Sequence, residues 1–566
     1  MTIKYRIISC LAVMLLFFIG LEARLWNIQV KMHSSMKETA TRQFERKLYL
    51  DPDRGVIFDR NRAELAQDVN SDSIFAIPGK ISNLKNTSSR LAPILCMSEA
   101  ALIEKLKHHS SFVWLKRKVA DSTAKRIRGL NLEGICLVQE KKRFYPENEL
   151  GCQVIGCVGI DNEGLAGIEK NFNKYLSSGR QKEVKLTDAL GRDVITTEVA
   201  SKAERKYSNI VLTIDKYIQH VAEVELKKAY IENKAFKATI IVQDPATGEI
   251  LALANFPNFN GNELLNNSCY INNPAITEVY EPGSTFKIVA ACAALEERIV
   301  MPSDKFFCEN GIYNINGYPI RDHEKEGWLN FEEVIMKSSN IGMAKIGEKL
   351  GKNCVYEYAR KFGFGNYTGI NMTGESNGIL KRPSEWSGIS LGRISFGQEI
   401  GATALQVIAS FSCLANNGRL MQPQIVRYIE DSEGKKTKEF RPVPIRQVIS
   451  EHTVDVMTRM LVKVVEEGTG AAAAVKGYKV AGKTGTGQKY CSKSGGYSST
   501  RYTASFAGYI PAFKPRVAIL VIIDEPAGVY YGGTAAAPVF SRVAEKIMDY
   551  YSIPCDNFEM AKANEN

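Results

Sequence analysis

The 566-residue sequence has little of what a metal centre or a channel needs. It has only six histidines, and its twelve cysteines are scattered without a Cys-x-x-Cys pair. Without clustered thiolate and imidazole ligands, we expect no zinc site and no other bound metal. The mean hydropathy of -0.17 is too polar for a protein with many membrane spans. With 45% hydrophobic and 24% charged residues and no internal repeat, the chain is predicted to fold into several globular domains.

The sequence contains one long apolar run, at its start. Lys4 and Arg6 precede the run Ile7–Leu21, and a helix continued to Trp26 would be about 30 Å long, the thickness of a hydrocarbon core. The two basic residues favour an N-terminus in the cytoplasm and a chain that continues outside it. A cleaved signal peptide is the alternative, but no small-x-small pair closes the run. We therefore predict a membrane anchor over residues 7–26.

A basic balance does not indicate a nucleic-acid partner here. The net charge is +11, and basic residues cluster at Lys116–Lys118 and Lys141–Arg143. Because most of the chain is predicted outside the cytoplasm, we expect no nucleic acid and interpret these clusters as a solvated face. Lipid headgroups or anionic wall polymers are the alternative partners for such a face.

The pattern of the sequence changes near residue 206. Residues 31 to 205 mix short patterns and turn signals without a long periodic helix, except for a possible helix near Glu99–Lys107, which is typical of an α+β segment. Beyond it the spacing of apolar residues predicts more regular elements. These are a strand over Asn209–Ile214, a helix over Lys216–Tyr230, a hairpin of Ala238–Asp244 with Glu249–Asn255, a strand over Arg516–Asp524 buried on both faces, and a helix over Ser541–Tyr550.

Two familiar motifs occur without the context that their chemistry requires. Gly477–Thr484 matches the phosphate-binding pattern GxxxxGK[ST], but Gly485 and Gly487 follow it and would weaken the helix that must start there. Gly388–Gly392 matches GxSxG around Ser390, yet no hydrophobic strand leads into it. We interpret neither as a nucleotide site or as a nucleophile elbow.

Three other short motifs agree with one another. Ser284 and Lys287 form a Ser-x-x-Lys pair at the head of the apolar run Ile288–Leu295, and residues three apart on a helix share a face. Ser338-Ser339-Asn340 follows 54 residues after Ser284, and Lys483-Thr484-Gly485-Thr486 follows another 145 residues on, at the end of a β-like run over 478–481. A lysine beside a hydroxyl can act as a base when it is desolvated, because burial lowers its pKa.

In this order and spacing, the three motifs resemble those of the penicillin-recognising serine transferases. Further segments are similar to the class B penicillin-binding proteins. They are Arg54–Asn61, Arg143–Pro146, Gly164–Glu169, Ser395–Gln398, Leu414–Gly418 and Tyr531–Phe540. The sequence departs from the first of these motifs at Arg62, where the family usually has glycine, and this change should affect a turn and not the chemistry.

The resemblance implies a fold of one N-terminal transmembrane helix, an α+β pedestal and a penicillin-binding transpeptidase domain. That last domain is α/β and β-lactamase-like, with a mainly antiparallel sheet flanked by helices. The predicted boundaries are a cytoplasmic segment 1–6, the anchor 7–26, a pedestal of the dimerisation type over 27–205, the transpeptidase domain over 206–553 and a tail over 554–566.

The resemblance also implies a serine acyl-enzyme D,D-transpeptidase that needs no cofactor. Ser284 would be the nucleophile and Lys287 its base, Ser338 would relay a proton with Lys483 in support, and Asn340 would orient the substrate amide. Ser339, Thr484, Gly485 and Thr486 would bind substrate, with the terminal carboxylate of the stem peptide, or that of a β-lactam, on Lys483, Thr484 and Thr486. The backbone N–H groups of Ser284 and Thr486 would form the oxyanion hole.

Within the class, the division-specific (FtsI-type) branch is the most similar, on Asn340, on the segment around Trp114 and on Arg321-Asp322 after Ile315–Gly317. The elongation- and sporulation-specific branches are the alternatives. A class A β-lactamase should carry an E-x-x-L-N motif between the second and third motifs, and a β-lactam sensor should carry a cytoplasmic signalling domain; we find neither.

The expected partners follow from the same resemblance. The substrates would be peptidoglycan stem peptides, and β-lactams would inhibit. The segment between anchor and transpeptidase is too short for a glycosyltransferase domain, so a separate membrane glycan polymerase and other division proteins are the expected partners. The protein would cross the inner membrane once, with its catalytic domain in the periplasm or an equivalent space.

Overall fold

The computed structural model describes residues 3–36, 45–50, 53–107, 113–177, 181–187, 193–194, 207–263, 271–491 and 496–556. The chain divides into two compact units. Unit 1 consists of Met1–Asp53 with Ser178–Arg205, and unit 2 consists of Arg54–Ser177 with Lys206–Asn566. Each unit is considered separately below. Most of the predicted tail lies outside the described residues.

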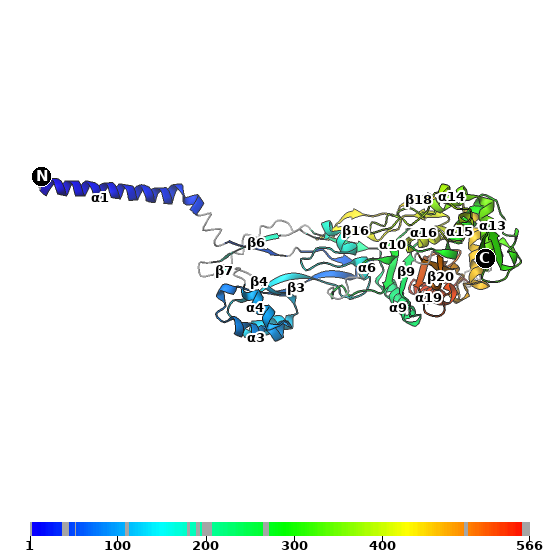
Figure 1. Cartoon of the computed structure of the whole chain (residues 1–566), viewed down its shortest axis with the longest axis horizontal. Coiled ribbons are helices and arrows are strands. Elements are labelled where there is room, and N and C mark those ends of the chain that lie inside the picture. The colour runs from blue at the N-terminus through cyan, green and yellow to red at the C-terminus, as the bar shows by residue number, and fades with distance from the viewer. Residues whose placement is uncertain are drawn as a thin grey trace. The chain divides into compact units, whose positions relative to one another are not determined.

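Unit 1 contains the N-terminal helix and a small sheet (Figure 1). The helix α1 covers Ile3–Trp26 and continues as a π-helical turn over Asn27–Lys31. At 1.5 Å per residue, the 24 residues of α1 extend about 36 Å, enough to cross a membrane. Among the described residues it is the one helix that is long and apolar enough to do so. The small sheet is antiparallel, in the order β1 (Glu45–Leu50), β6 (Gln181–Thr187) and β7 (Asp193–Val194).

Unit 2 begins with strands that belong to one seven-stranded sheet. Its order is β17-β16-β8-β2-β3-β4, and β5 also pairs with β3. The bounds are β2 Ile57–Phe58, β3 Glu64–Ala76, β4 Val113–Val119, β5 Ile135–Phe144, β8 Ser208–Leu212, β16 Val426–Asp431 and β17 Lys436–Glu439. The parallel pairing of β2 with β8 therefore joins the segment predicted as a pedestal to the segment predicted as a transpeptidase.

Three helices pack beside β3 and β4 (Figure 1). They are α3 Leu84–Leu95, α4 Glu99–Lys107 and α5 Asp121–Leu130. The predicted helix at Glu99–Lys107 is confirmed as α4. Helix α3 was not predicted, because its buried face includes Thr87 and Ser88 and its last turns include Pro93, so apolar periodicity is weak.

An ion network holds together three segments that are far apart in the sequence. Glu169 accepts from Arg54 Nε at 2.5 Å and from Arg143 Nε at 2.6 Å, and both guanidinium groups are buried. Asp68 accepts from Arg143 at 3.1 Å and from the backbone of Arg54 at 2.9 Å. Arg54, Arg143 and Glu169 come from three of the segments on which the family resemblance rests. Their shared task is therefore structural, since removal of the Glu169 carboxylate would take from two buried guanidinium groups the negative charge that they share.

Arg62, the departure from the family pattern, occupies a glycine-like position. Its φ is +70°, a left-handed conformation that costs a non-glycine residue free energy. Its side chain forms a two-pronged ion pair with Glu430 at 2.7 and 3.0 Å and lies over the ring of Phe58. The guanidinium group holds the pKa of Glu430 below its usual value. These contacts offset the backbone strain that a glycine would avoid.

The second half of unit 2 is built on a five-stranded antiparallel sheet in the order β10-β9-β21-β20-β19. The bounds are β9 Lys237–Gln243, β10 Ile250–Phe256, β19 Ala481–Cys491, β20 Gly496–Ile510 and β21 Val517–Asp524. The predicted hairpin is confirmed as β9 and β10. The predicted two-sided strand is confirmed as β21, whose Ile519 and Val521 enter one core while Leu520 and Ile522 enter the other.

Helices cover both faces of this sheet. Figure 1 shows α16 (Ala404–Ala415) on one side of β9 and β20, and α9 (Lys216–Glu232) with α19 (Ala537–Tyr550) on the other. The first side is completed by α11 (Lys287–Glu296) and α17 (Glu451–Glu466). The helices predicted over 216–230 and 541–550 are thus confirmed, the second starting earlier, at Ala537. The fold agrees with the predicted fold class.

Shorter elements complete the unit. The short helices are α6 Cys152–Ile155, α7 Gly167–Asn171, α8 Asn173–Leu176, α10 Pro274–Thr277, α12 Phe331–Met336, α13 Asn340–Leu350, α14 Lys352–Lys361, α15 Ser390–Ser395 and α18 Gly532–Ala535. The short strands are β11 Lys305–Phe307, β12 Ile312–Ile315, β13 Tyr318–Arg321, β14 Trp328–Asn330, β15 Arg419–Met421 and β18 Pro444–Gln447.

Candidate active site

The first motif lies on a tight turn that leads into a buried helix. Ser284 is part of a 3-10 helix over Gly283–Phe286, and Lys287 starts α11 directly behind it. Because residues i and i+3 eclipse one another in a 3-10 helix, the side chains of Ser284 and Lys287 leave the same face. Gly283 has φ +55° and donates its N–H to the carbonyl of Gly397 at 3.0 Å. The turn is therefore attached to a second loop before α11 begins.

The second motif lies at the junction of α12 and α13 and faces Lys287. The Nζ atom of Lys287 is 2.6 Å from the carbonyl oxygen of Ser338, 3.1 Å from its Oγ and 2.9 Å from Oδ1 of Asn340. Ser338 has φ +61°, an uncommon conformation for serine that directs its carbonyl and hydroxyl to the same amine. The structure thus brings Lys287, Ser338 and Asn340 into direct contact.

Ser339, the middle residue of this motif, has a different environment. Its side chain is buried, and its hydroxyl donates to Asp322 at 2.6 Å and accepts from the backbone N–H of Gly342 at 2.9 Å. It caps the N-terminus of α13. These bonds use the hydroxyl proton and one of its lone pairs within the fold, so the predicted contact of Ser339 with substrate stays a prediction that its side chain does not support.

The third motif lies within the edge strand β19. Lys483, Thr484, Gly485 and Thr486 pair with residues 504–507 of β20. We predicted a strand over 478–481 that ends before the motif; the strand instead starts at Ala481 and includes the motif. Glycine lowers strand propensity, but here it permits close packing, because a Cβ on Gly485 would lie 2.9 Å from Thr285 and 3.1 Å from the carbonyl of Pro282. The turn Gly283–Phe286 that carries Ser284, called the serine turn below, therefore lies directly against β19.

Two buried lysines determine the electrostatics of the site. Lys287 and Lys483 are both fully buried. Burial lowers the pKa of Lys287 to about 7, although the charges of Asp322 and Cys308 act in the opposite direction. Burial, together with the charge of Lys287, lowers the pKa of Lys483 well below its usual value. An amine with a pKa near 7 is a competent general base at neutral pH.

The two threonines of the third motif are hydrogen-bonded by Gly532, from the family-like segment Tyr531–Phe540, and by Thr469, which the sequence did not indicate. The hydroxyl groups of Thr484 and Thr469 are 2.7 Å apart, and the backbone N–H of Gly532 donates to Oγ1 of Thr486 at 3.2 Å. Lys483 Nζ donates to the carbonyl of Thr484 at 3.3 Å. The only signal for Thr469 was its place between Gly468 and Gly470, which is too weak to assign a role.

The two motifs set aside on sequence grounds have unsuitable surroundings. The residues after Lys483-Thr484 continue as β19, whereas a phosphate-binding loop requires a helix there. Ser390 starts the short helix α15 and donates its hydroxyl to Glu399 at 2.6 Å. Neither geometry fits the chemistry of the motif.

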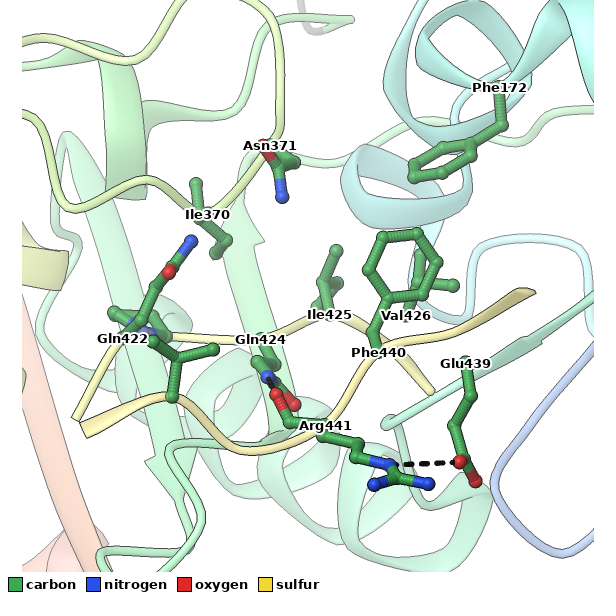
Figure 2. A pocket seen from close by; sticks show the side chains of 12 residues that line it. Phe172, Ile370, Asn371, Gln422, Gln424, Ile425, Val426, Glu439, Phe440 and Arg441 are labelled. Carbon is green, nitrogen blue, oxygen red and sulfur yellow. Dashed lines mark hydrogen bonds and ion pairs between the residues drawn. The ribbon is translucent and has the colours of Figure 1, made fainter. Parts of the chain in front are cut away.

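Figure 2 shows the residues that line a cavity of about 320 Å³. Its walls are formed by Phe172 and by residues of the 370–371, 422–426 and 439–443 segments. Phe172 and Phe440 meet edge to face there, with ring centroids 6.3 Å apart, and Arg441 pairs with Glu439 at 3.3 Å. None of the motif residues lines it, so this cavity is not the reaction site.

Comparison with known proteins agrees with this geometry. Residues 238–545 match the penicillin binding protein transpeptidase domain, and residues 49–212 match the penicillin-binding protein dimerisation domain. The chain belongs to the class B penicillin-binding proteins. All three motifs of this penicillin-binding protein fall inside the first matched range.

Similar proteins cover almost the whole penicillin-binding protein. Stage V sporulation protein D of Bacillus subtilis is 33% identical over 552 residues, 96% of this chain and 85% of that protein. Peptidoglycan D,D-transpeptidase FtsI of Escherichia coli is 31% identical over 568 residues, 98% of this chain and 93% of that protein. The crystal structure of penicillin binding protein 3 from Mycobacterium tuberculosis complexed with aztreonam has a TM-score of 0.70 and 27% identity, over 90% of this chain and 98% of that chain.

Proposed function

We propose that this protein is a peptidoglycan D,D-transpeptidase that cross-links stem peptides through an acyl-enzyme on Ser284. The observation that carries the proposal is the contact of the Lys287 amine with Ser338 and Asn340, at 2.6–3.1 Å, beside the turn that presents Ser284. A buried lysine with a pKa near 7 supplies the base that a serine nucleophile needs. The type of reaction is inferred from the family relationship.

Acylation would begin with Lys287. As a neutral amine it has two N–H bonds and one lone pair, and the carbonyl of Ser338 and Oδ1 of Asn340 are suited to accept the two N–H bonds. The lone pair then remains for a hydroxyl proton. Lys287 takes the proton of Ser284 while Oγ attacks the penultimate D-Ala carbonyl. The oxyanion binds the backbone N–H groups of Ser284 and Thr486, and each such donor typically contributes about 2.7–4 kcal/mol.

Transfer would follow on the same groups. The bond to the terminal D-Ala breaks, and Ser338 relays a proton to the leaving amine with Lys483 in support. Asn340 orients the substrate amide, and Lys483, Thr484 and Thr486 bind the terminal carboxylate, with Gly485 keeping the strand close to the serine turn. The amine of a neighbouring stem peptide then attacks the ester and restores the Ser284 hydroxyl. A β-lactam would acylate Ser284 in the same way, as the solved relatives complexed with aztreonam and ampicillin suggest.

We assign this activity to septal wall synthesis at the inner membrane. The relatives named FtsI and the FtsI-like segments of the sequence support this role. In the proposed topology, residues 1–6 are cytoplasmic, the anchor 7–26 lies within α1, the pedestal covers 27–205, the periplasmic transpeptidase domain covers 206–553, and 554–566 form a tail. A separate membrane glycan polymerase would supply the strands to be cross-linked, together with other division proteins.

Labelling with a fluorescent penicillin tests the nucleophile. The wild-type chain should be labelled covalently, and Ser284→Ala should abolish labelling because Ser284 is the serine whose side chain leaves the turn on the same face as Lys287. Ser390→Ala is the matched control, since it removes the serine of the GxSxG motif and should leave labelling intact. Labelled Ser284→Ala protein would contradict the assignment, and rapid hydrolysis of the β-lactam by the purified protein would move the function to a β-lactamase.

A further inference from the structure

The turn that carries the second motif holds an unfavourable backbone conformation. Ser338 has φ +61°, although serine has a Cβ that makes this region costly. This conformation directs both the carbonyl and the hydroxyl of Ser338 toward Lys287. Such a residue keeps its conformation only when its surroundings over-determine it. The contacts of the neighbouring residues should therefore show what holds the turn.

Asp322, directly after β13, accepts three hydrogen bonds from the residues that follow Ser338. Its Oδ1 accepts from the backbone N–H groups of Asn340 at 2.5 Å and Ile341 at 3.0 Å, and its Oδ2 accepts from the hydroxyl of Ser339 at 2.6 Å. These groups form the first turn of α13, where backbone N–H groups lack helical partners and a negative charge is favourable. Both oxygens of one carboxylate thus attach the motif to β13.

The backbone of Arg321, the residue before Asp322, completes this attachment. Nδ2 of Asn340 donates to the carbonyl of Arg321 at 2.9 Å. Since the amide nitrogen is occupied there, Oδ1 is the atom left to face Nζ of Lys287, at 2.9 Å. If the Asn340 amide were flipped, its Nδ2 hydrogens would point at the N–H bonds of Lys287. Arg321 and Asp322 together therefore decide which atom of Asn340 meets the catalytic amine.

We propose that Asp322 is a positioning residue for acylation, which holds Ser338 and Asn340 against Lys287 and balances the charge of that lysine. The inference rests on the proposed transpeptidase function and deepens it, because it assigns the second motif a support that lies outside all three motifs. Asp322 acts through Ser338, Asn340 and Lys287 and needs no contact with substrate.

The charge of Asp322 has a separate, measurable consequence. Three titratable groups interact with Lys287: Asp322 and Cys308 raise its pKa against the lowering effect of burial, and Lys287 in turn lowers the pKa of Lys483. The thiol of Cys308 also lies 3.4 Å from the Ser339 hydroxyl. Removing the carboxylate charge would remove the larger of the two effects that oppose burial. The pKa of Lys287 should then fall below its value of about 7.

The test is the pH profile of acylation by fluorescent penicillin, measured on the full-length protein in detergent for wild type and Asp322→Asn. Asparagine keeps the size but loses the charge and one acceptor oxygen. We expect acylation at pH 8 to slow roughly 10- to 100-fold, as displaced catalytic groups do, and the midpoint to move to lower pH by at least about 0.5 unit. Asp304→Asn is the matched control, because Asp304 also accepts a backbone N–H, from Met301 at 2.9 Å, in an exposed loop.

Two further results decide the proposal. Ser339→Ala removes one hydrogen-bond donor to Asp322 but keeps the charge of Asp322. Acylation should therefore slow, while the midpoint of its pH profile should not move. Thermal unfolding identifies any variant that fails to fold. If Asp322→Asn does not fold, the test is made with Ser339→Ala and Asp322→Glu. A folded Asp322→Asn protein with wild-type acylation, or with a slower rate at an unmoved midpoint, would overturn the proposed role. A negative result for Asp322 would not affect the proposed transpeptidase function, provided that the wild-type protein is labelled and Ser284→Ala is not.

Discussion

At the level of single residues, the amine of Lys287 contacts two protein acceptors and a hydroxyl group in place of water. A lysine in water is a cation up to about pH 10. Complete burial disfavours the charged form and outweighs the opposing charge of Asp322, so the pKa of Lys287 falls to about 7. The residue type alone indicates a cation, and the burial makes it a base.

A pH titration of acylation measures this shift. The reaction needs neutral Lys287, so the rate constant for acylation should rise with pH through about 7 and level off above about 8. The stability of the fold should change in the same direction. The unfolded chain keeps Lys287 and Lys483 protonated up to about pH 10 and so binds more protons than the folded chain, which makes the free energy of unfolding rise from pH 7 toward 10. A flat acylation profile between pH 6 and 8 would contradict this assignment.

At the level of elements, the site depends on how closely a turn, a loop and a strand approach one another. The serine turn lies between β19 and the loop at Gly397. A Cβ on Gly397 would lie 2.1 Å from the carbonyl of Gly283, and a Cβ on Gly485 would lie 2.4 Å from Oγ of Ser505. Both contacts are too short for any side chain. Glycine at Gly397 therefore allows the close approach of the Gly283 backbone as well as a left-handed turn, and glycine at Gly485 leaves room for the Ser505 hydroxyl.

Gly397→Ala should displace the serine turn from β19. The substitution places a methyl group against the backbone at Gly283 and also strains its own backbone, since φ is +88°. We expect acylation to slow at least roughly tenfold, because a displacement of about 1 Å at a catalytic group can cost 100-fold. Gly434→Ala serves as the control: its φ is +83°, but a Cβ there would meet nothing within 4 Å. Equal acylation by both variants would show that the contact with Gly283 is unimportant.

At the level of the whole molecule, the parts that the sequence suggests as separate domains are joined within unit 2. Strand β2, from the predicted pedestal, pairs in parallel with β8, from the predicted transpeptidase. The buried network of Arg54, Arg143 and Glu169 stabilises the pedestal side of this sheet. In unit 1, α1 supplies a membrane-spanning length. The helix thus gives the chain a means of attachment to a membrane, and unit 2 carries the three motifs.

A fluorescent fusion in dividing cells tests the septal role. The fusion should gather at midcell during constriction, and a Ser284→Ala fusion should gather there as well but fail to restore septation in cells depleted of the wild-type protein. Even distribution along the side wall would favour an elongation role, and appearance only in sporulating cells would favour a sporulation role. Full rescue by Ser284→Ala would indicate a scaffold and not an enzyme.

Much of the fold was predictable because its signals are local. The nearly continuous apolar run over Arg516–Asp524 and the helical spacing over Lys216–Tyr230 each depend on a few neighbouring residues, and both elements were found where they were predicted. Helix α3 was missed because hydroxyl residues form part of its buried face. The extent of β19 was misjudged because Gly482, Gly485 and Gly487 lower strand propensity, whereas in the fold they allow close packing.

The sequence by itself determined the family, the apolar anchor and the three motifs with Ser284, Lys287 and Lys483, because residue type and spacing survive without knowledge of the fold. Only the tertiary structure decided what those residues can do. The low pKa of Lys287, the left-handed Ser338 and the support from Asp322 and Thr469 all arise from contacts across many residues of chain. Burial and hydrogen bonding depend on which distant segments meet, and no local pattern in the sequence encodes that.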